Sequence, residues 1–305
     1  MPTTLKQEIA FVGTGLHGGR PVRMVLRPAA AGGVRFRRTD VTDRDNIIPA
    51  RYDLVSDTRL NTRLTNPAGV SVATVEHLMA ALAGTGVWNA VVDIDGPEVP
   101  IMDGSAARFV QKIVAAGLRH LPGPTRAIRV LKPVSVRIGE AEASIAPAGQ
   151  LEVEFEIDFA DAAIGRQKKA LTLENGVFVR ELADCRTFCN RADVEAMQAR
   201  GLALGGSLDN AVVVEDGEVL NPEGLRRADE FVRHKMLDAV GDLALAGAPI
   251  LGAYRGVRAG HGTTNALLRE LFATPGAWIE TALDADTARR LPGAGVVPAD
   301  LRRAG

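Results

Sequence analysis

The 305-residue sequence contains few aromatic residues, only two cysteines and no excess of either charge. Phenylalanine, tryptophan and tyrosine make up 4% of it, so the core must be built mainly from valine, leucine, isoleucine and alanine. Cys185 and Cys189 are too few for a disulfide framework or a four-cysteine zinc site, and free thiols favour a reducing compartment. With 36 basic and 37 acidic residues, the chain lacks the basic excess typical of a nucleic-acid-binding protein.

The sequence also lacks segments that would target or anchor it to a membrane. Residues 1–15 show neither the basic start nor the apolar run of a signal peptide. No stretch of about 18 uncharged apolar residues predicts a spanning helix. We therefore expect a cytoplasmic protein without a transmembrane segment.

Each half of the sequence shows strand patterns followed by helix patterns. Residues 20–37 and 126–158 alternate polar and apolar side chains, as half-buried strands do. Helical patterns follow them, at 74–83 and 106–116 in the first half and at 193–200, 226–246 and 266–272 in the second.

The segment 121–125 contains proline and glycine, and strand alternation restarts directly after it. The sequence thus predicts an α+β fold of two domains, residues 1–121 and 126–305, each with a sheet layered against helices. The end of the segment after Asp284, rich in alanine, arginine, glycine and proline, is expected to be loosely ordered.

Two adjacent residues in the first helical pattern are candidates for catalysis. Glu76 and His77 point about 100° apart, so both can reach one cavity if the helix edge lines it. A carboxylate beside a histidine is what a metal site with a general base requires. Because the HExxH zinc signature is absent, a partly exposed glutamate beside a hydrogen-bonded histidine remains the alternative.

The longest helical pattern carries a second candidate group. His234, Asp238 and Asp242 follow one another at i, i+4 and i+8 and so lie on one helix face. His234 and Asp238 could bind one ion, and Asp242 could accept a hydrogen bond from another histidine. The apolar neighbours predict a largely buried helix, in which unpaired carboxylates are costly. A bound cation would remove that cost, and a solvated charged face is the alternative.

A third candidate, His261, stands between Gly260 and Gly262, where a substrate can approach closely. Such a loop suits a general acid, although a simple turn is the alternative. If the three segments meet, two histidines and one aspartate could hold one metal with water in an open fourth position. This ligand set favours zinc over magnesium or calcium, and the open position is typical of a catalytic site.

Several stretches, taken in order, resemble one enzyme family. They are TVEHL at 74–78, PEVPIMDGSA at 97–106, RTF at 186–188, DEFVRHKMLDAVGDL at 229–243 and the pair at 260–261. They are similar to the UDP-3-O-acyl-N-acetylglucosamine deacetylases, zinc amidases of lipid A biosynthesis. The similarity extends from about residue 13 to about residue 280, and 229–243 is its most specific segment.

The resemblance implies a role for each matching residue. The implied zinc ligands are His77, His234 and Asp238, with iron as a candidate replacement for zinc. Glu76 matches the general base of the family, and His261 matches its general acid.

Three more residues match groups that support the reaction. Asp242 matches the carboxylate that orients and charges His261, while Lys235 and Thr187 match polar groups near the reacting carbonyl. The family fold consists of two similar domains with the active site between them, in agreement with the boundary at 121–125.

The resemblance also implies where the substrate binds. Phe188 and Asp193 match residues near its sugar and nucleotide. The stretch that matches the family's apolar acyl passage contains Val194, Met197, Leu202, Ala203, Ser207, Leu208, Asn210 and Val213. The chain departs from some relatives at Arg63, Asn190 and Arg191, which puts acyl-length preference and inhibitor fit in doubt.

The resemblance implies zinc-dependent hydrolysis of the N-acetyl group of UDP-3-O-acyl-N-acetylglucosamine, the committed step of lipid A biosynthesis. The partner is then this small molecule, handled by a monomer in the cytoplasm and near the inner membrane surface. A zinc amidohydrolase of another N-acetylated sugar or peptide is the alternative enzyme. A non-catalytic protein with a structural zinc is the alternative from another class, and the charge balance gives no reason to expect a nucleic-acid partner.

Overall fold

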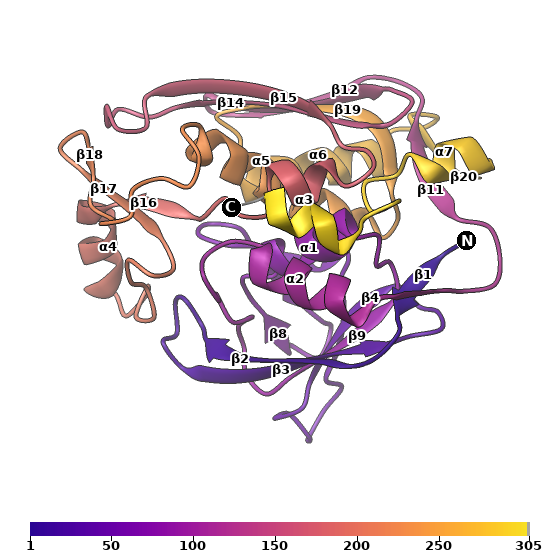
Figure 1. The fold of residues 1–305 in the computed structure, drawn as a ribbon, viewed down its shortest axis with the longest axis horizontal. Coiled ribbons are helices and arrows are strands. Elements are labelled where there is room, and N and C mark those ends of the chain that lie inside the picture. The colour runs from indigo at the N-terminus through magenta and orange to yellow at the C-terminus, as the bar shows by residue number, and fades with distance from the viewer. Residues whose placement is uncertain (304–305) are drawn as a thin grey trace.

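The computed structural model describes residues 1–303, which form a layered α+β molecule (Figure 1). A large sheet at the top of the view covers helices α5 (Glu230–Leu243) and α6 (His261–Ala273). Helices α1 (Glu76–Gly84) and α2 (Ala107–Ala116) lie below them, above a second large sheet. The predicted fold class is therefore confirmed, and four layers place the helices in the centre of the molecule.

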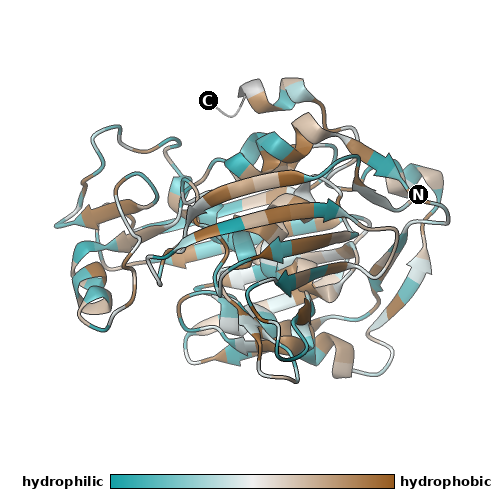
Figure 2. Cartoon of the chain, turned by 90° about the horizontal axis from the view of Figure 1, so that it is seen from below, coloured by the Kyte–Doolittle hydropathy of each residue, from teal (hydrophilic) through white to brown (hydrophobic). Residues whose placement is uncertain are grey.

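The lower sheet has five strands in the order β2-β3-β9-β4-β5. Their bounds are Ile9–Thr14 (β2), Pro21–Pro28 (β3), Val34–Arg38 (β4), Ile47–Pro49 (β5) and Ala90–Ile94 (β9). The alternation predicted at 20–37 corresponds to β3 and β4, separated by a turn at Gly32 and Gly33, both with positive φ. Figure 2 views the molecule from below, and hydrophobic and hydrophilic residues alternate along the strands that face the viewer. The inward-facing Met24, Leu26 and Phe36 are fully buried.

The N-terminal half contains two smaller sheets as well. Strands β1 and β10 pair with each other, and β6, β7 and β8 form a three-stranded sheet. Their bounds are Thr3–Leu5 (β1), Val55–Asp57 (β6), Arg63–Thr65 (β7), Ser71–Val72 (β8) and Leu118–His120 (β10), with a short 3-10 helix, η1, at Tyr52–Leu54.

The upper sheet has seven strands, with β19 at its centre. They are Arg126–Val130 (β11), Val134–Ile138 (β12), Ala141–Pro147 (β13), Leu151–Asp158 (β14), Arg166–Thr172 (β15), Ile250–Val257 (β19) and Trp278–Ala282 (β20). Strand β19 runs parallel to β14 and β11 and antiparallel to β13. As β14 alternates, it buries Leu151, Val153, Phe155 and Ile157 toward α5.

A small unit stands at one side of the molecule, at the left of Figure 1. It consists of β16 (Phe188–Asn190), α4 (Arg191–Gln198), β17 (Val212–Glu215) and β18 (Glu218–Val219). Helix α4 begins two residues before the predicted start at 193, because the Asn190 side chain accepts a hydrogen bond from the backbone N of Ala192 at 3.0 Å. That contact is an N-cap.

The other helices differ from their predicted ranges mainly at their starts. Helix α1 begins at Glu76 rather than 74, because Thr74 has a φ of 58° that no α-helix accommodates. Helix α5 begins at Glu230 rather than 226, because the Glu230 carboxylate accepts a bond from the backbone N of Arg226 and closes a turn there. Helix α5 ends in a 3-10 turn, η2 (Ala244–Ala246).

His261 was expected in a loop, and this expectation is wrong. The first turn of α6 closes at Gly260, whose carbonyl accepts a hydrogen bond from Thr264 N at 3.0 Å. His261 is therefore the first residue of a helix that extends to Ala273, well before the start predicted at 266.

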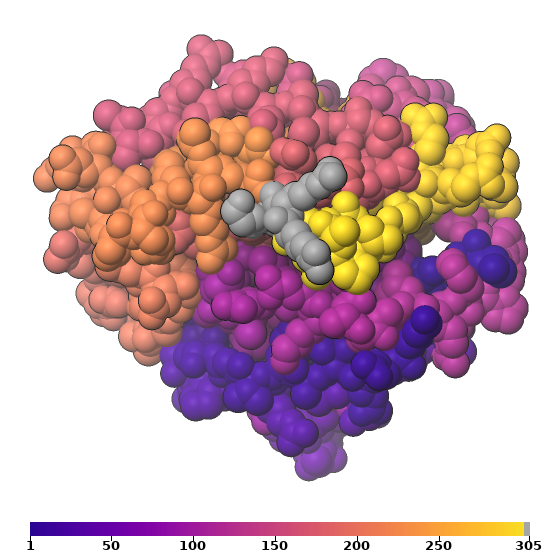
Figure 3. Space-filling view, in the orientation of Figure 1, coloured from indigo at the N-terminus to yellow at the C-terminus, as the bar shows by residue number. Residues whose placement is uncertain are grey.

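The C-terminal segment lies across the boundary between the two halves, in yellow in Figure 3. The carbonyls of Leu291 and Pro292 accept hydrogen bonds from Asn175 and Gly176, at the start of α3 (Val177–Glu181). Gly293 packs on the backbone of Gly86, where a Cβ would have no room. The segment also contains α7 (Ala285–Arg289) and a 3-10 helix, η3 (Pro298–Arg303). Its last two residues, part of the end expected to be loosely ordered, lie outside the described residues.

Within residues 1–303, no sheet combines strands from before residue 121 with strands from after 126. The division into domains at 1–121 and 126–305 stays a prediction. Among the same residues, no helix has the length and hydrophobicity that a membrane crossing requires.

Helices α1 and α5 come from different halves and touch at their backbones. A Cβ placed on Gly241 of α5 would lie 2.0 Å from the carbonyl oxygen of Glu76, so only glycine allows this approach. All of α5 except Lys235 is buried, as its apolar neighbours predict. The contact places the start of α1 against the polar face of α5.

Candidate active site

Three buried side chains converge where α1 meets α5. His77 is the second residue of α1, and His234 and Asp238 lie one turn apart on α5. Asp238 Oδ1 lies 3.5 Å from His77 Nε2 and 3.3 Å from His234 Nε2. One nitrogen or oxygen from each residue lies within 4.8 Å of the others. The structure thus brings together the three residues predicted as metal ligands.

The donor atoms of this cluster are suited to a cation. His234 Nδ1 lies 3.0 Å from the carbonyl oxygen of Cys185, so Nδ1 carries the proton and Nε2 presents its lone pair to the cluster. Burial lowers the pKa of His234 to about 4, which keeps its imidazole neutral. Asp238 Oδ1 is buried without a hydrogen-bond partner among the described residues. Such an oxygen is costly unless a cation or donor meets it, so the residues present fit a divalent metal.

A second cluster lies next to the first. His261 Nδ1 lies 2.8 Å from Asp242 Oδ2, and His261 Nε2 lies 3.8 Å from Glu76 Oε1. Asp242 comes from α5, one turn beyond Asp238, and Glu76 directly precedes His77 on α1. An acid–base pair thus stands beside the cluster of candidate metal ligands.

Burial and charge give the two members of this pair different proton affinities. Burial disfavours the charged imidazole, but the carboxylates of Asp242 and Glu76 outweigh it and raise the pKa of His261 to about 9. His261 is therefore protonated at neutral pH. Burial raises the pKa of Glu76 above its ordinary value, toward the range that suits a general base.

Lys235 and Phe188 border the cluster of candidate metal ligands as well. Lys235 Nζ donates to Asp238 Oδ2 at 2.8 Å. Lys235 is half-buried, and the loss of solvent around it disfavours its charge, yet the Asp238 carboxylate raises the pKa of Lys235 and keeps it cationic. The Phe188 ring lies 6.1 Å from the His234 ring and 5.0 Å from that of Phe231.

Thr187 joins this region to the N-terminal half. Its backbone N donates to the carbonyl of Gly104 at 2.8 Å, and it follows Cys185 by two residues. Thr187 is half-buried. The predicted helper role of its hydroxyl stays a prediction.

The residues predicted to bind the nucleotide and acyl chain belong to the small unit at the side of the molecule and to the loop that follows α4. Asp193 is exposed in the first turn of α4, and Ala203 and Asn210 are buried. Val194, Met197, Leu202 and Val213 are half-buried, whereas Ser207 and Leu208 are exposed. An acyl passage among these side chains stays a prediction.

The three departures from the family pattern occupy different settings. Asn190 caps α4, and the exposed Arg191 pairs with Glu195 and Glu215. Arg63 is exposed at the start of β7. The structure therefore gives Asn190 a local role in starting the helix, and the effect of the three departures on acyl-length preference stays a prediction.

One residue of the cluster has no counterpart among the sequence predictions. Thr62 donates from its backbone N to Glu76 Oε2 at 3.0 Å and from its hydroxyl to Asp242 Oδ1 at 2.6 Å. No motif marks it, because it lies in a loop and its partners come from elsewhere in the chain. Only a prediction of the contact between that loop and α5 could have found it.

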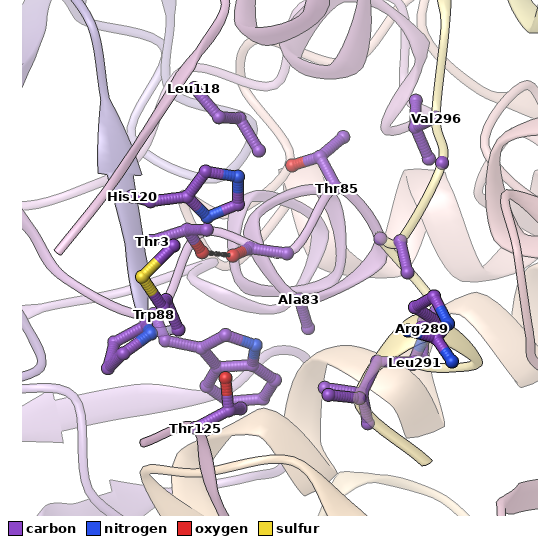
Figure 4. A pocket seen from close by; sticks show the side chains of 18 of the residues that line it. Thr3, Ala83, Thr85, Trp88, Leu118, His120, Thr125, Arg289, Leu291 and Val296 are labelled. Carbon is purple, nitrogen blue, oxygen red and sulfur yellow. Dashed lines mark hydrogen bonds between the residues drawn. The ribbon is translucent and has the colours of Figure 1, made fainter. Parts of the chain in front are cut away.

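A separate cavity of about 560 Å³ lies at the other end of α1 (Figure 4). Its walls include Ala83, Trp88, Leu118, Leu291 and Val296. None of the predicted site residues lines it. The cavity belongs to the boundary between the N-terminal half and the C-terminal segment, not to the acid–base cluster.

The chain is similar to known proteins over most of its length. The family model described as "LpxC: UDP-3-O-acyl N-acetylglycosamine deacetylase" matches residues 2–273. A protein of Phenylobacterium zucineum named UDP-3-O-acyl-N-acetylglucosamine deacetylase is 53% identical over 276 residues, covering 90% of this chain and 94% of the relative. A protein of the same name from Vibrio parahaemolyticus is 46% identical over 284 residues, covering 92% and 93%. This chain therefore belongs to the LpxC family of UDP-3-O-acyl-N-acetylglucosamine deacetylases.

Proposed function

We propose that this chain hydrolyses the N-acetyl group of UDP-3-O-acyl-N-acetylglucosamine, the committed step of lipid A biosynthesis. The products are acetate and the UDP-linked 3-O-acyl-glucosamine. The observation that carries the proposal is the pair of Glu76 and His261, 3.8 Å apart beside a buried His/His/Asp cluster. Relatives that carry this activity in their names are 46–53% identical to the chain.

We assign a divalent cation to His77, His234 and Asp238, and the two nitrogens and one oxygen favour zinc, with iron as the substitute. When bound, the cation supplies Lewis-acid chemistry, polarising the amide carbonyl and favouring loss of a proton from water. The neutral His234 and the partnerless Asp238 Oδ1 support this assignment.

Glu76 acts as the general base. Its Oε1 takes a proton from the attacking water as the new carbon–oxygen bond forms at the acetamide carbonyl. Burial raises the pKa of Glu76, so the carboxylate is a stronger base than an exposed glutamate. Lys235 and Thr187 are the proposed donors for the negative charge that develops on the carbonyl oxygen.

His261 acts as the general acid. Its Nε2 donates a proton to the sugar nitrogen as the carbon–nitrogen bond breaks, and a free amine leaves. Asp242 fixes the ring through Nδ1 and stabilises its charged form, which supports the role of proton donor.

The remaining assignments follow from the substrate. Phe188 and Asp193 are proposed to contact the sugar and nucleotide, and the apolar residues from Val194 to Val213 are proposed to hold the acyl chain. One chain supplies every proposed catalytic group, so a monomer suffices. A UDP-linked sugar and the free thiols of the chain favour the cytoplasm, near the inner membrane surface where later lipid intermediates reside.

The test measures deacetylation by Glu76→Ala and His261→Ala variants that retain bound metal. Each is expected to lose at least about a hundredfold in kcat, because each removes one proton-transfer group. The exposed His120 provides the control, since His120→Ala should leave the rate unchanged. Activity near wild type in both variants would refute the assignment.

Two further measurements separate this proposal from its alternatives. An amidohydrolase of other N-acetylated substrates would accept an N-acetyl sugar without nucleotide or acyl chain as readily as the UDP-linked substrate. A structural metal site would have a fourth protein ligand and resist inhibition by a hydroxamate, which chelates an open metal.

A further inference from the structure

Thr62 contacts both catalytic carboxylates at once. It is 1% exposed and lies in the loop between β6 and β7. Its backbone N donates to Glu76 Oε2 at 3.0 Å, and its hydroxyl donates to Asp242 Oδ1 at 2.6 Å. Its carbonyl accepts a bond from Val75 N, directly before α1, at 3.3 Å. Every polar atom of this residue is therefore engaged at the contact between α1 and α5.

The two carboxylates divide their oxygens in the same way. Glu76 directs Oε2 to Thr62 and leaves Oε1 facing His261 Nε2 at 3.8 Å. Asp242 directs Oδ1 to Thr62 and Oδ2 to His261 Nδ1 at 2.8 Å. Thr62 and His261 thus contact different oxygens of each of the two carboxylates.

From this arrangement we infer that Thr62 is a positioning residue of the proposed deacetylation: it holds one oxygen of each carboxylate and so aims the other oxygen at His261. The inference rests on the proposed function, because it assigns Thr62 a part in the same acid–base pair. The hydrogen bonds of Thr62 go to Glu76, Asp242 and Val75 and to none of the candidate metal ligands, so the proposed role acts through Glu76 and Asp242.

The hydroxyl matters more than the backbone in this role. Any residue other than proline offers a backbone N–H to Glu76, but few side chains of this size place a donor 2.6 Å from Asp242 Oδ1. A hydrogen bond to a charged acceptor is stronger than one between neutral groups, and losing it leaves a buried carboxylate oxygen without its donor. The hydroxyl also ties the loop to α5, and the loop in turn carries the backbone N–H that holds Glu76.

The test compares Thr62→Val, which keeps the shape and removes the hydroxyl, with Thr62→Ser, which keeps the hydroxyl. Thr62→Val is expected to lose about 10- to 100-fold in kcat, because small misplacements of catalytic groups have effects of that order. Its KM and metal content should stay near wild type, since the contacts of Thr62 are to the acid–base pair. Thr62→Ser should stay within about threefold of wild type, because serine supplies the same donor.

Thr65→Val makes the same chemical change in the neighbouring strand. Thr65 is half-buried, and its hydroxyl contacts Ser56 rather than a catalytic residue. The kcat of the Thr65→Val variant should therefore equal that of the wild type. If Thr62→Val does not fold, as judged by its unfolding transition, Thr62→Ala replaces it and is expected to show the same loss.

A double-mutant cycle with Asp242→Ala supplies a readout that a purely structural role would not change, because alanine leaves no side-chain oxygen to accept the hydrogen bond of the Thr62 hydroxyl. If Thr62 acts through Asp242, removing the hydroxyl should cost much less in kcat once Asp242 has been replaced, so the two losses should not add. Wild-type kcat in Thr62→Val, an equal loss in Thr62→Ser, or fully additive losses in the cycle would each overturn the inference. Failure of the proposed function is distinguishable, because the wild-type chain itself would then not deacetylate the UDP-linked substrate.

Discussion

Replacing Gly241 by alanine should move Glu76 and His77 of α1 away from the residues of α5 that complete the two clusters, the proposed acid–base group and the candidate metal ligands. The added Cβ would lie 2.0 Å from the carbonyl oxygen of Glu76, whereas ordinary contact begins at 3.4 Å. The difference, 3.4 − 2.0, means that α1 and α5 must move apart by about 1.4 Å, because the atom in the way is backbone and cannot rotate aside. This movement takes Glu76 and His77 away from Asp238 and Asp242.

The expected loss is larger in rate than in stability. Overpacking of this kind costs about 1–3 kcal/mol, but alanine in a helix interior recovers about 1 kcal/mol relative to glycine. The net destabilisation should therefore be only about 0–2 kcal/mol. A misplacement of about 1 Å between catalytic groups, in contrast, can cost on the order of a hundredfold in rate.

Steady-state kinetics, a metal-binding competition and urea denaturation on the same preparation measure these quantities. We expect Gly241→Ala to fold, to bind metal more weakly and to lose on the order of a hundredfold in kcat/KM. Gly149→Ala is the matched control, because a Cβ at Gly149 meets nothing within 4 Å. Wild-type kinetics and metal affinity in Gly241→Ala would show that the helix contact does not set the geometry of the site.

Three more predictions concern the charges of the site and its surroundings. Proton donation by His261 requires its protonated form, so the rate should fall as the pH rises through about 9. Asp242→Asn should move this high-pH side of the pH–rate profile to lower pH. An unchanged profile would contradict the pairing of His261 with Asp242. Removing the metal with a chelator should lower the unfolding temperature, and zinc should restore it, since a ligand that binds only the folded state stabilises it; unchanged melting would argue against the proposed site. Arg186→Met should lower the free energy of unfolding in urea by about 3–5 kcal/mol, because it leaves the fully buried Glu230 as an unpaired charge. A decrease below about 1 kcal/mol would mean that water reaches this ion pair.

The parts of the site that lie on one helix could be predicted from the sequence. Helix geometry alone puts His234, Asp238 and Asp242 on one face, and the apolar residues between them indicate burial. The pairing of Asp242 with another histidine was expected for the same reason and is present at 2.8 Å. Spacing along the sequence is sufficient here because, in a regular helix, residues four positions apart lie on the same face.

The meeting of α1 with α5 could not be predicted from local patterns. It depends on the absence of a side chain at Gly241, and a glycine within a helical pattern usually indicates only lower helix propensity. The contacts of Thr62 could not be predicted for a similar reason, since its partners Glu76 and Asp242 lie in other elements. The residue types in the three segments allowed one shared metal site as a hypothesis, and the resemblance to a known family implied that the segments meet.

The predicted starts of some helices were wrong because contacts of individual residues decide where a helix begins. Asn190 in front of α4 is a residue type that commonly caps helices, so the true start at Arg191 was within reach of sequence reasoning. Thr74 was not, because threonine rarely adopts the positive φ that it has here. Its hydroxyl donates to Glu98 at 3.0 Å, a partner that only the folded chain supplies.

The division of the candidate ligands between two halves has a consequence for the synthesis of the protein. His77 leaves the ribosome long before His234 and Asp238, and domains made first tend to fold first. A nascent N-terminal half therefore carries one of the three candidate ligands, His77, and lacks the two that α5 supplies. The complete set forms only when α5 docks on α1. Under the proposed metal assignment, loading would therefore be a late event, and the active enzyme would form only after most of the chain has been made.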